Sequence, residues 1–309
     1  MGRRFESDRR SQFIESPGRH RRPFFVSPNR KLEKVDPFCF HGVILVGTRV
    51  LHRLLVDDIA DRRPESLRWL RVSRQPDGST CGPTCLHAVY RYWNDQISLE
   101  DVIAEVHPLS TGGTLAGFLA NHALRRGYRA TLYTYNLQLF DPSWFDKESS
   151  ERILAKLTEQ VAAKGDDRLE EGTKAFQEFL TLGGDLRFEV LTPQLIRSHL
   201  NRGVPILTGL SATYLYGCAR EFRDEYDDVR GKPVGHFVVL SGYDKKRREV
   251  RVADPLHNNP RFQSPYYRVS IHRLVSAILL GIVTSDANLL VIEPSRRRQS
   301  SRHVRTHRR

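Results

Sequence analysis

The stretch QPDGSTCGPTCLHAVYRYW, residues 75–93, constrains the fold more than any other part of the chain. A Gly-Ser-Thr run at 78–80 breaks the chain, and after it the apolar positions recur at helical spacing, at Leu86, Val89, Tyr90 and Trp93. Cys81 is therefore expected in the first turn of a helix. Unpaired backbone N–H groups and the positive end of the helix dipole favour a thiolate there. Because the thiolate is the nucleophile, this position predicts a reactive cysteine.

A second informative stretch, GHFVVLSGYDKKRREVRVADP, spans residues 235–255. Two runs of alternating and β-branched residues, 236–243 and 248–253, flank a charged turn and predict a β-hairpin. This pairing places His236 roughly opposite Asp254 and Pro255, at the open end of both strands. A general base and the carboxylate that orients it need this relation. Gln75 can donate a side-chain N–H to an oxyanion, beside the backbone N–H of Cys81.

The pattern Q-x5-C-G-x-x-C-L, followed by H-F-V-V-L-x-G-Y-D and V-A-D-P, resembles the C39 and C39-like cysteine peptidases. These enzymes have a papain-like fold, and their best known members process double-glycine leader peptides. The resemblance covers roughly residues 70–294 and implies Cys81 as nucleophile, His236 as base, Asp254 as its orienting residue and Gln75 as oxyanion donor. It also implies cleavage of a peptide or amide bond in a peptide or protein substrate through a thioacyl-enzyme intermediate. No ATP-binding module is evident, so a stand-alone hydrolase is expected.

Other functions are compatible with these residues. The same triad can transfer its acyl group to an amine, as in an acyltransferase or transglutaminase-like enzyme, because only the acceptor differs. A non-catalytic C39-like peptide-binding module should lack the Cys or the His, and this chain has both. Cys81, Cys85 and His87 could bind zinc, but no second Cys/His cluster supplies a fourth ligand, so neither a metal nor another cofactor is expected. Simple burial in the core explains the presence of Cys85 better than metal binding does.

Helical patterns dominate the first half of this region and strand patterns the second. Helices are expected from Cys81 and at 99–106, 114–126, 151–163, 168–182, 193–201 and 271–280, and strands at 128–135, 186–191, 204–210, 236–243, 248–253, 266–270 and 287–292. This order predicts an α+β fold in which the nucleophile helix packs against an antiparallel sheet that carries the base.

Two segments depart from this core. Residues 141–184 form a predicted helical insertion. Residues 211–235 are aromatic and charged, and they lead directly into the base strand. The candidate substrate contacts lie there, at Tyr214, Tyr216 and Gly235, with further candidates at Glu221, Arg223 and Asp224.

The formal net charge of +13 comes from the two ends of the chain. Residues 1–34 carry ten basic and four acidic side chains, 296–309 carry seven Arg and no acid, and 35–295 carry 32 of each sign. The ends are therefore expected to be disordered basic arms that contact nucleic acid or acidic surfaces weakly. The predicted organisation is an arm at 1–35, an uncertain extension at 36–69, the peptidase domain at 70–294 and a tail at 295–309.

The sequence also suggests where the protein resides. Its N-terminal arginines precede no apolar core, as a secretory signal would require. The most apolar early segment, residues 38–55, is too short and too charged to span a bilayer. The four cysteines, Cys39, Cys81, Cys85 and Cys218, lack the spacing of a disulfide scaffold. A cytoplasmic location is expected.

Overall fold

The computed structural model describes residues 70–295 apart from 110–111, 147–148 and 166. All of these residues lie in the unit Leu54–Arg309. The predicted arm and extension, and the tail beyond Ser295, lie outside the described residues.

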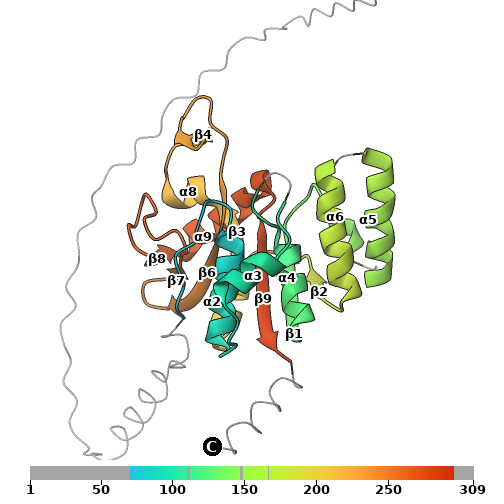
Figure 1. Ribbon diagram of the computed structural model, residues 1–309, viewed down its shortest axis with the longest axis horizontal. Helices are drawn as coiled ribbons and strands as arrows, with labels where there is room; N and C mark the ends of the chain where they lie inside the picture. The colour runs from blue at the N-terminus through green and yellow to red at the C-terminus, as the bar shows by residue number, and fades with distance from the viewer. Residues whose placement is uncertain (1–69, 110–111, 147–148, 166, 296–309) are drawn as a thin grey trace, which may run out of the picture. The chain divides into compact units, whose positions relative to one another are not determined.

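A seven-stranded sheet in the order β2-β1-β9-β3-β6-β7-β8 forms the centre of the fold (Figure 1). All neighbouring pairs are antiparallel except β1 and β2. The α+β prediction is thus confirmed: β1 alone of these strands comes from the first half of the chain. The strands are β1 (Tyr128–Thr134), β2 (Asp185–Arg187), β3 (Ile206–Ser211), β6 (Gly235–Asp244), β7 (Glu249–Ala253), β8 (Tyr266–Ser270) and β9 (Asn288–Pro294).

Helices cover both faces of this sheet. One face packs against α2 (Cys81–Tyr92) and α4 (Ala116–Arg125), with α3 (Leu99–Glu105) packed on α2. The other face packs against α7 (Pro193–Leu200), α8 (Ala212–Tyr216) and α9 (Ile271–Leu280). A hydrophobic cluster lies on each face of the sheet, and alternate residues of β6 point into one or the other. Phe237 and Val239 belong to the cluster on the α2 side, and Val238 and Leu240 to the cluster on the α9 side. A strand buried on both faces explains why the HFVVL run is continuously apolar.

The helix α2 lies close to the strand β6. A Cβ on Gly82 would lie 2.7 Å from Thr114 Cγ2 and 3.3 Å from the Phe237 ring, so only glycine fits without a shift. One turn later, Cys85 Sγ donates a hydrogen bond to the backbone oxygen of Phe237 at 3.2 Å. These contacts fix α2 against β6 at the end where Cys81 and His236 lie.

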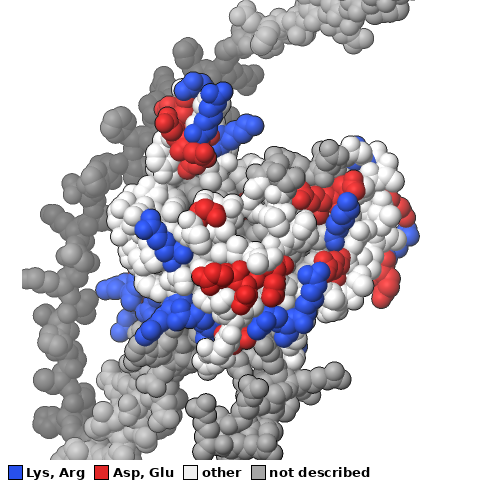
Figure 2. Space-filling model, viewed as in Figure 1, with Lys and Arg blue, Asp and Glu red and all other residues white. Residues whose placement is uncertain are grey.

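The predicted insertion and the segment before the base strand are at the periphery. The insertion contains η2 (Pro142–Trp144), α5 (Ser150–Lys164) and α6 (Asp167–Thr181), and α6 packs on α4 and α5. The other segment forms a hairpin arm, β4 (Glu221–Phe222) and β5 (Glu225–Tyr226), that projects beyond α8 (Figure 1). Acidic and basic side chains are interspersed on this arm (Figure 2).

Candidate active site

The helix α2 and the strand β6 begin at the same end of the sheet (Figure 1). The side chains of Cys81 and His236 are hydrogen-bonded to each other there. His236 Nε2 lies 2.9 Å from Asp254 Oδ1, which leaves the other ring nitrogen, Nδ1, for the thiol. The structure therefore brings the predicted nucleophile, base and orienting carboxylate into one hydrogen-bonded chain.

The register of the hairpin differs by one to two residues from the prediction. Val239 pairs with Ala253, so Val238 rather than His236 is the residue opposite Asp254. The shift arises at the turn, because Asp244 pairs with Glu249 and the turn is therefore 245–248 instead of 244–247. An extra residue in β6 between Leu240 and Gly242 moves the pairing back by one residue. His236 and Val238 face the same side of the strand, so His236 still reaches Asp254, on a diagonal.

Asp254 is fully buried and accepts four hydrogen bonds. Its Oδ1 accepts from His236 Nε2 and from the backbone N–H of Leu256, each at 2.9 Å. Its Oδ2 accepts from the hydroxyls of Tyr216 at 2.8 Å and Tyr267 at 2.6 Å. Burial alone would raise the pKa of Asp254, but attraction to His236 and these hydrogen bonds hold it below its ordinary value. Asp254 is therefore ionised at neutral pH.

Two opposing effects set the pKa of the buried His236 side chain. Burial opposes a positive imidazole, but the Asp254 carboxylate and the bond to Cys81 outweigh it and raise the pKa of His236 to about 10. An imidazolium beside the thiol at neutral pH can hold a thiolate as an ion pair. The α2 N-terminus adds to this effect, because Thr80 makes no side-chain hydrogen bond that would cap the helix.

The backbone of Gln75 is hydrogen-bonded to the segment that follows Asp254. Its N–H donates to the carbonyl oxygen of Pro255 at 3.1 Å, which ties the loop before α2 to the residue after Asp254. Its side-chain Nε2 donates to the carbonyl oxygen of Asp77 at 2.8 Å. An amide nitrogen has two N–H groups, so one donor is left for an oxyanion. The Oε1 atom is buried without a partner among the described residues.

The three expected substrate contacts lie in different surroundings. Tyr216 is only 4% exposed and its hydroxyl binds Asp254, so it supports the carboxylate instead of presenting a surface to substrate. Tyr214 is 38% exposed and carries the Arg273 guanidinium 5.1 Å from its ring centre. Gly235 is half-buried and directly precedes His236. The further candidates Glu221, Arg223 and Asp224 lie in the hairpin arm and its turn.

Two residues of the site, Tyr267 and Asp286, were not expected from the sequence. Tyr267 stacks on Phe262 with ring centres 3.8 Å apart and reaches Asp254 from β8. Its inward position follows from the alternation of β8, but its partner is 13 residues away and no motif marks it. Asp286 lies in the loop before β9, next to Gly235, where its placement depends on long-range strand pairing.

The other described cysteines lie in surroundings that disfavour a reactive thiolate. Burial raises the pKa of Cys85 well above its ordinary value, which disfavours its thiolate. Cys218 has a raised pKa for the same reason, and Cys39 lies outside the described residues. Over the residues that the structure describes, no group of three or more His, Cys, Asp and Glu is arranged to hold a metal ion.

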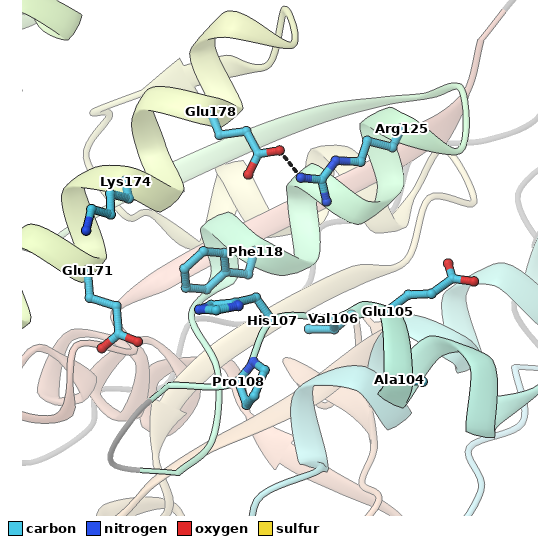
Figure 3. A pocket seen from close by; sticks show the side chains of 10 residues that line it. All are labelled: Ala104, Glu105, Val106, His107, Pro108, Phe118, Arg125, Glu171, Lys174 and Glu178. Atoms are coloured by element: carbon cyan, nitrogen blue, oxygen red, sulfur yellow. Dashed lines mark hydrogen bonds and ion pairs between the residues drawn. The ribbon is translucent and has the colours of Figure 1, made fainter.

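A pocket of about 390 Å³ lies apart from these residues, between α3, α4 and α6 (Figure 3). Arg125 and Glu178 form an ion pair in its wall, and the tilted rings of His107 and Phe118 pack together with their centres 4.7 Å apart. None of the four predicted catalytic residues lines it.

Residues 184–270 match the model of the Peptidase_C39 like family. The predicted resemblance to C39-like peptidases is confirmed over these residues. The matched C39-like segment contains His236 and Asp254, whereas Gln75 and Cys81 precede it. No curated protein is significantly similar in sequence to the chain.

Several solved structures are similar to the chain at low identity. One, from Bacillus anthracis and described as a C39-like peptidase, is 14% identical with a TM-score of 0.41, over 73% of this chain and 95% of its own. A double glycine motif protease from a transporter, in complex with the leader peptide, is 14% identical with a TM-score of 0.36, over 74% and 93%. Xylellain, a cysteine protease from Xylella fastidiosa, is 15% identical with a TM-score of 0.33, over 75% and 90%.

Within the described ranges, none of the helices combines the length and apolarity that crossing a membrane requires.

Proposed function

We propose that this protein is a cysteine peptidase that hydrolyses a peptide or amide bond. Cys81 is the nucleophile, His236 the general acid and base, Asp254 its orienting residue and Gln75 an oxyanion donor. The observation that carries the proposal is the hydrogen-bonded chain from Cys81 through His236 to the buried Asp254. The family match over residues 184–270 supports the same roles for His236 and Asp254.

The first half of the reaction acylates the enzyme. The Cys81 thiolate attacks the carbonyl carbon, and the C=O π electrons move to the oxygen to give a tetrahedral oxyanion. The backbone N–H of Cys81 and the remaining N–H of Gln75 stabilise that charge. When the carbonyl re-forms, the C–N bond breaks and the His236 imidazolium gives its proton to the departing amine. A thioester on Cys81 remains.

The second half releases the acid. His236, now neutral, takes a proton from a water molecule as that water attacks the thioester carbon. The second oxyanion collapses, the C–S bond breaks, and the thiolate and imidazolium are restored. Throughout, Asp254 keeps its charge and fixes the ring, with Nε2–H directed at Oδ1 and Nδ1 at the sulfur.

A peptide-library digest followed by mass spectrometry tests this proposal. The full chain should cleave library peptides and, after rapid acid quenching, carry an acyl group on Cys81 in peptide maps. Cys81→Ala should show neither product nor adduct, whereas Cys218→Ala should retain both and serves as the matched thiol control. Addition of an amine acceptor separates hydrolysis from acyl transfer, because a transferase forms the new amide in preference to the acid. Cleavage by Cys81→Ala at the original rate would contradict the proposal.

A further inference from the structure

The carboxyl group of Asp286 lies over the Cα atom of Gly235, the residue directly before His236. A Cβ at Gly235 would lie 1.7 Å from Asp286 Oδ2 and 2.8 Å from Thr284 Oγ1. The carboxyl therefore fills the space that any other side chain would need. Because Gly235 has no side chain, a niche exists next to the base, and it holds one carboxyl and one hydroxyl.

The fold fixes this carboxyl in place. Asp286 follows the short helix η3 (Gly281–Thr284), and its backbone N–H donates to the Gly281 oxygen at 2.8 Å. Its own carbonyl oxygen accepts from Asn288 Nδ2 at 2.8 Å. Gly209 permits the approach, since a Cβ there would lie 2.4 Å from that same oxygen. The position of Asp286 is thus built from contacts with η3, β9 and β3.

The Asp286 carboxyl is buried in this niche and forms no ion pair with another described residue. Asp286 is only 8% exposed, and burial raises its pKa to about 7 against the opposing effects of the Thr284 hydroxyl and the His236 charge. The ion pairs found among the described residues do not include Asp286. His236 acts on it only through space, because its ring is bonded to Asp254 and Cys81. A buried carboxylate without a bonded cation is costly, so pairing of this carboxylate with a cation is favoured.

We propose that Asp286 and Thr284 form a subsite that binds the cationic side chain of a Lys or Arg residue close to the scissile bond of the substrate. This inference rests on the proposed peptidase function and names a substrate preference for the same site. The Asp286 carboxylate pairs with the ammonium or guanidinium group, and Thr284 Oγ1 accepts one of its N–H groups. A neutral side chain of similar length would leave the carboxylate buried and unpaired, which is a strong basis for discrimination.

Matched irreversible probes test the subsite without a need for turnover. Three pairs of tripeptide chloromethyl ketones carry Lys or norleucine at the first, second or third residue from the reactive carbon, with Ala elsewhere. Cys81 Sγ displaces chloride and forms a thioether, and peptide mapping gives the rate at Cys81. At pH 8, one Lys probe should react at least about 30-fold faster than its norleucine partner, because loss of one partner from a buried charge pair costs 2 kcal/mol or more.

Two comparisons assign this preference to Asp286. Asp286→Asn should bring the Lys-to-norleucine rate ratio to about one, whereas Asp244→Asn, at the far end of the hairpin, should keep it. In the unaltered protein the ratio should fall between pH 8 and pH 6 as Asp286 becomes protonated. Thr284 from η3 and the His236 charge from β6 face this carboxyl, and His236 keeps its proton over that range.

Each outcome decides between the two proposals. Labelling of Cys81 at equal rates by all three pairs at pH 8 overturns the subsite and leaves the peptidase proposal standing. A Lys preference that survives Asp286→Asn, or that does not change with pH if that variant fails to fold, also overturns it. Absence of any labelling at Cys81 overturns the peptidase proposal, and the subsite with it.

Discussion

The two oxygens of Asp254 have separate partners, and this division organises the site at the scale of single residues. Oδ1 faces His236, while two phenol groups hold Oδ2. An orienting carboxylate held on its far side cannot rotate away from the imidazole when the ring changes its protonation state. Tyr216 and Tyr267 therefore act as positioning residues, through Asp254.

Asp254→Asn should lower turnover of a cleaved peptide by about 10² to 10⁴, because His236 can then adopt the wrong tautomer. Steady-state kinetics measure the effect. Asp244→Asn is the control, since Asp244 lies at the turn of the hairpin and forms an exposed ion pair with Arg268. A silent Asp254→Asn together with a damaging Asp244→Asn would mean that the orienting carboxylate is misassigned.

Tyr267→Phe should lower the free energy of unfolding by about 1.5 to 3 kcal/mol, because it removes a hydrogen bond to a buried charged group. Urea denaturation at pH 7 measures this change. Tyr266→Phe is the matched control, since its hydroxyl accepts a bond only from the neutral backbone N–H of Val72 at 3.0 Å. The control should cost about 0.5 to 1.5 kcal/mol. An equal loss in both variants would argue against a strongly bound Asp254 carboxylate.

At the scale of elements, the close contact of α2 with β6 positions the thiol. This contact depends on Gly82, whose Cα faces Thr114 and Phe237. A side chain there would push the helix N-terminus away from the strand that carries His236.

Gly82→Ala should destabilise the fold by about 1 to 3 kcal/mol and slow the alkylation of Cys81, because the added methyl group overlaps Thr114 Cγ2. Thr114→Ser removes that carbon and keeps the hydroxyl, which donates to the His107 oxygen at 3.0 Å. The double variant should therefore recover part of both losses, as measured by thermal unfolding and alkylation rate. Simple additivity of the two substitutions would show that the helix is positioned by other contacts.

The predicted elements show what local sequence determines and what it does not. The start of α2 was predicted at Cys81, where it is observed, because a Gly-Ser-Thr break and a helical repeat both mark it. The hairpin was predicted, but its register was wrong because its turn lies at residues 245–248, one residue beyond the predicted turn. The helix α8 was not predicted, since five residues are too few to show a helical period. The tyrosine and Asp286 contacts depend on pairings between distant segments, which no local pattern encodes.

At the scale of the whole molecule, β3 pairs with both β9 and β6, and this pairing of distant segments brings Asp286 beside Gly235. Burial of the ionised Asp286 carboxyl in this niche lowers the stability of the folded protein. In the folded state Asp286 has a pKa raised to about 7 by burial, whereas in the unfolded state its pKa is ordinary. Its contribution to stability is therefore full below the unfolded pKa and is lost as pH rises through the folded pKa.

Asp286→Asn should accordingly become more stable relative to the unaltered protein as pH rises from 4 to 8. The difference in free energy of unfolding should grow by a few kcal/mol, on the order of 1.4 per pKa unit, and level off above pH 8. Denaturant titrations at four pH values measure it. A difference that is constant with pH would mean that Asp286 is solvated in the folded protein.

The central claim is that the His236–Asp254 pair activates Cys81, and the rate of alkylation at each cysteine tests it most directly. With limiting iodoacetamide at pH 7 and peptide mapping, Cys81 should be modified before Cys39, Cys85 and Cys218. His236→Ala should slow the reaction at Cys81 by about tenfold or more, because the thiolate loses its ion-pair partner, and should leave the other three rates unchanged. Equal modification of all four thiols, or an unchanged Cys81 rate in His236→Ala, would contradict the account.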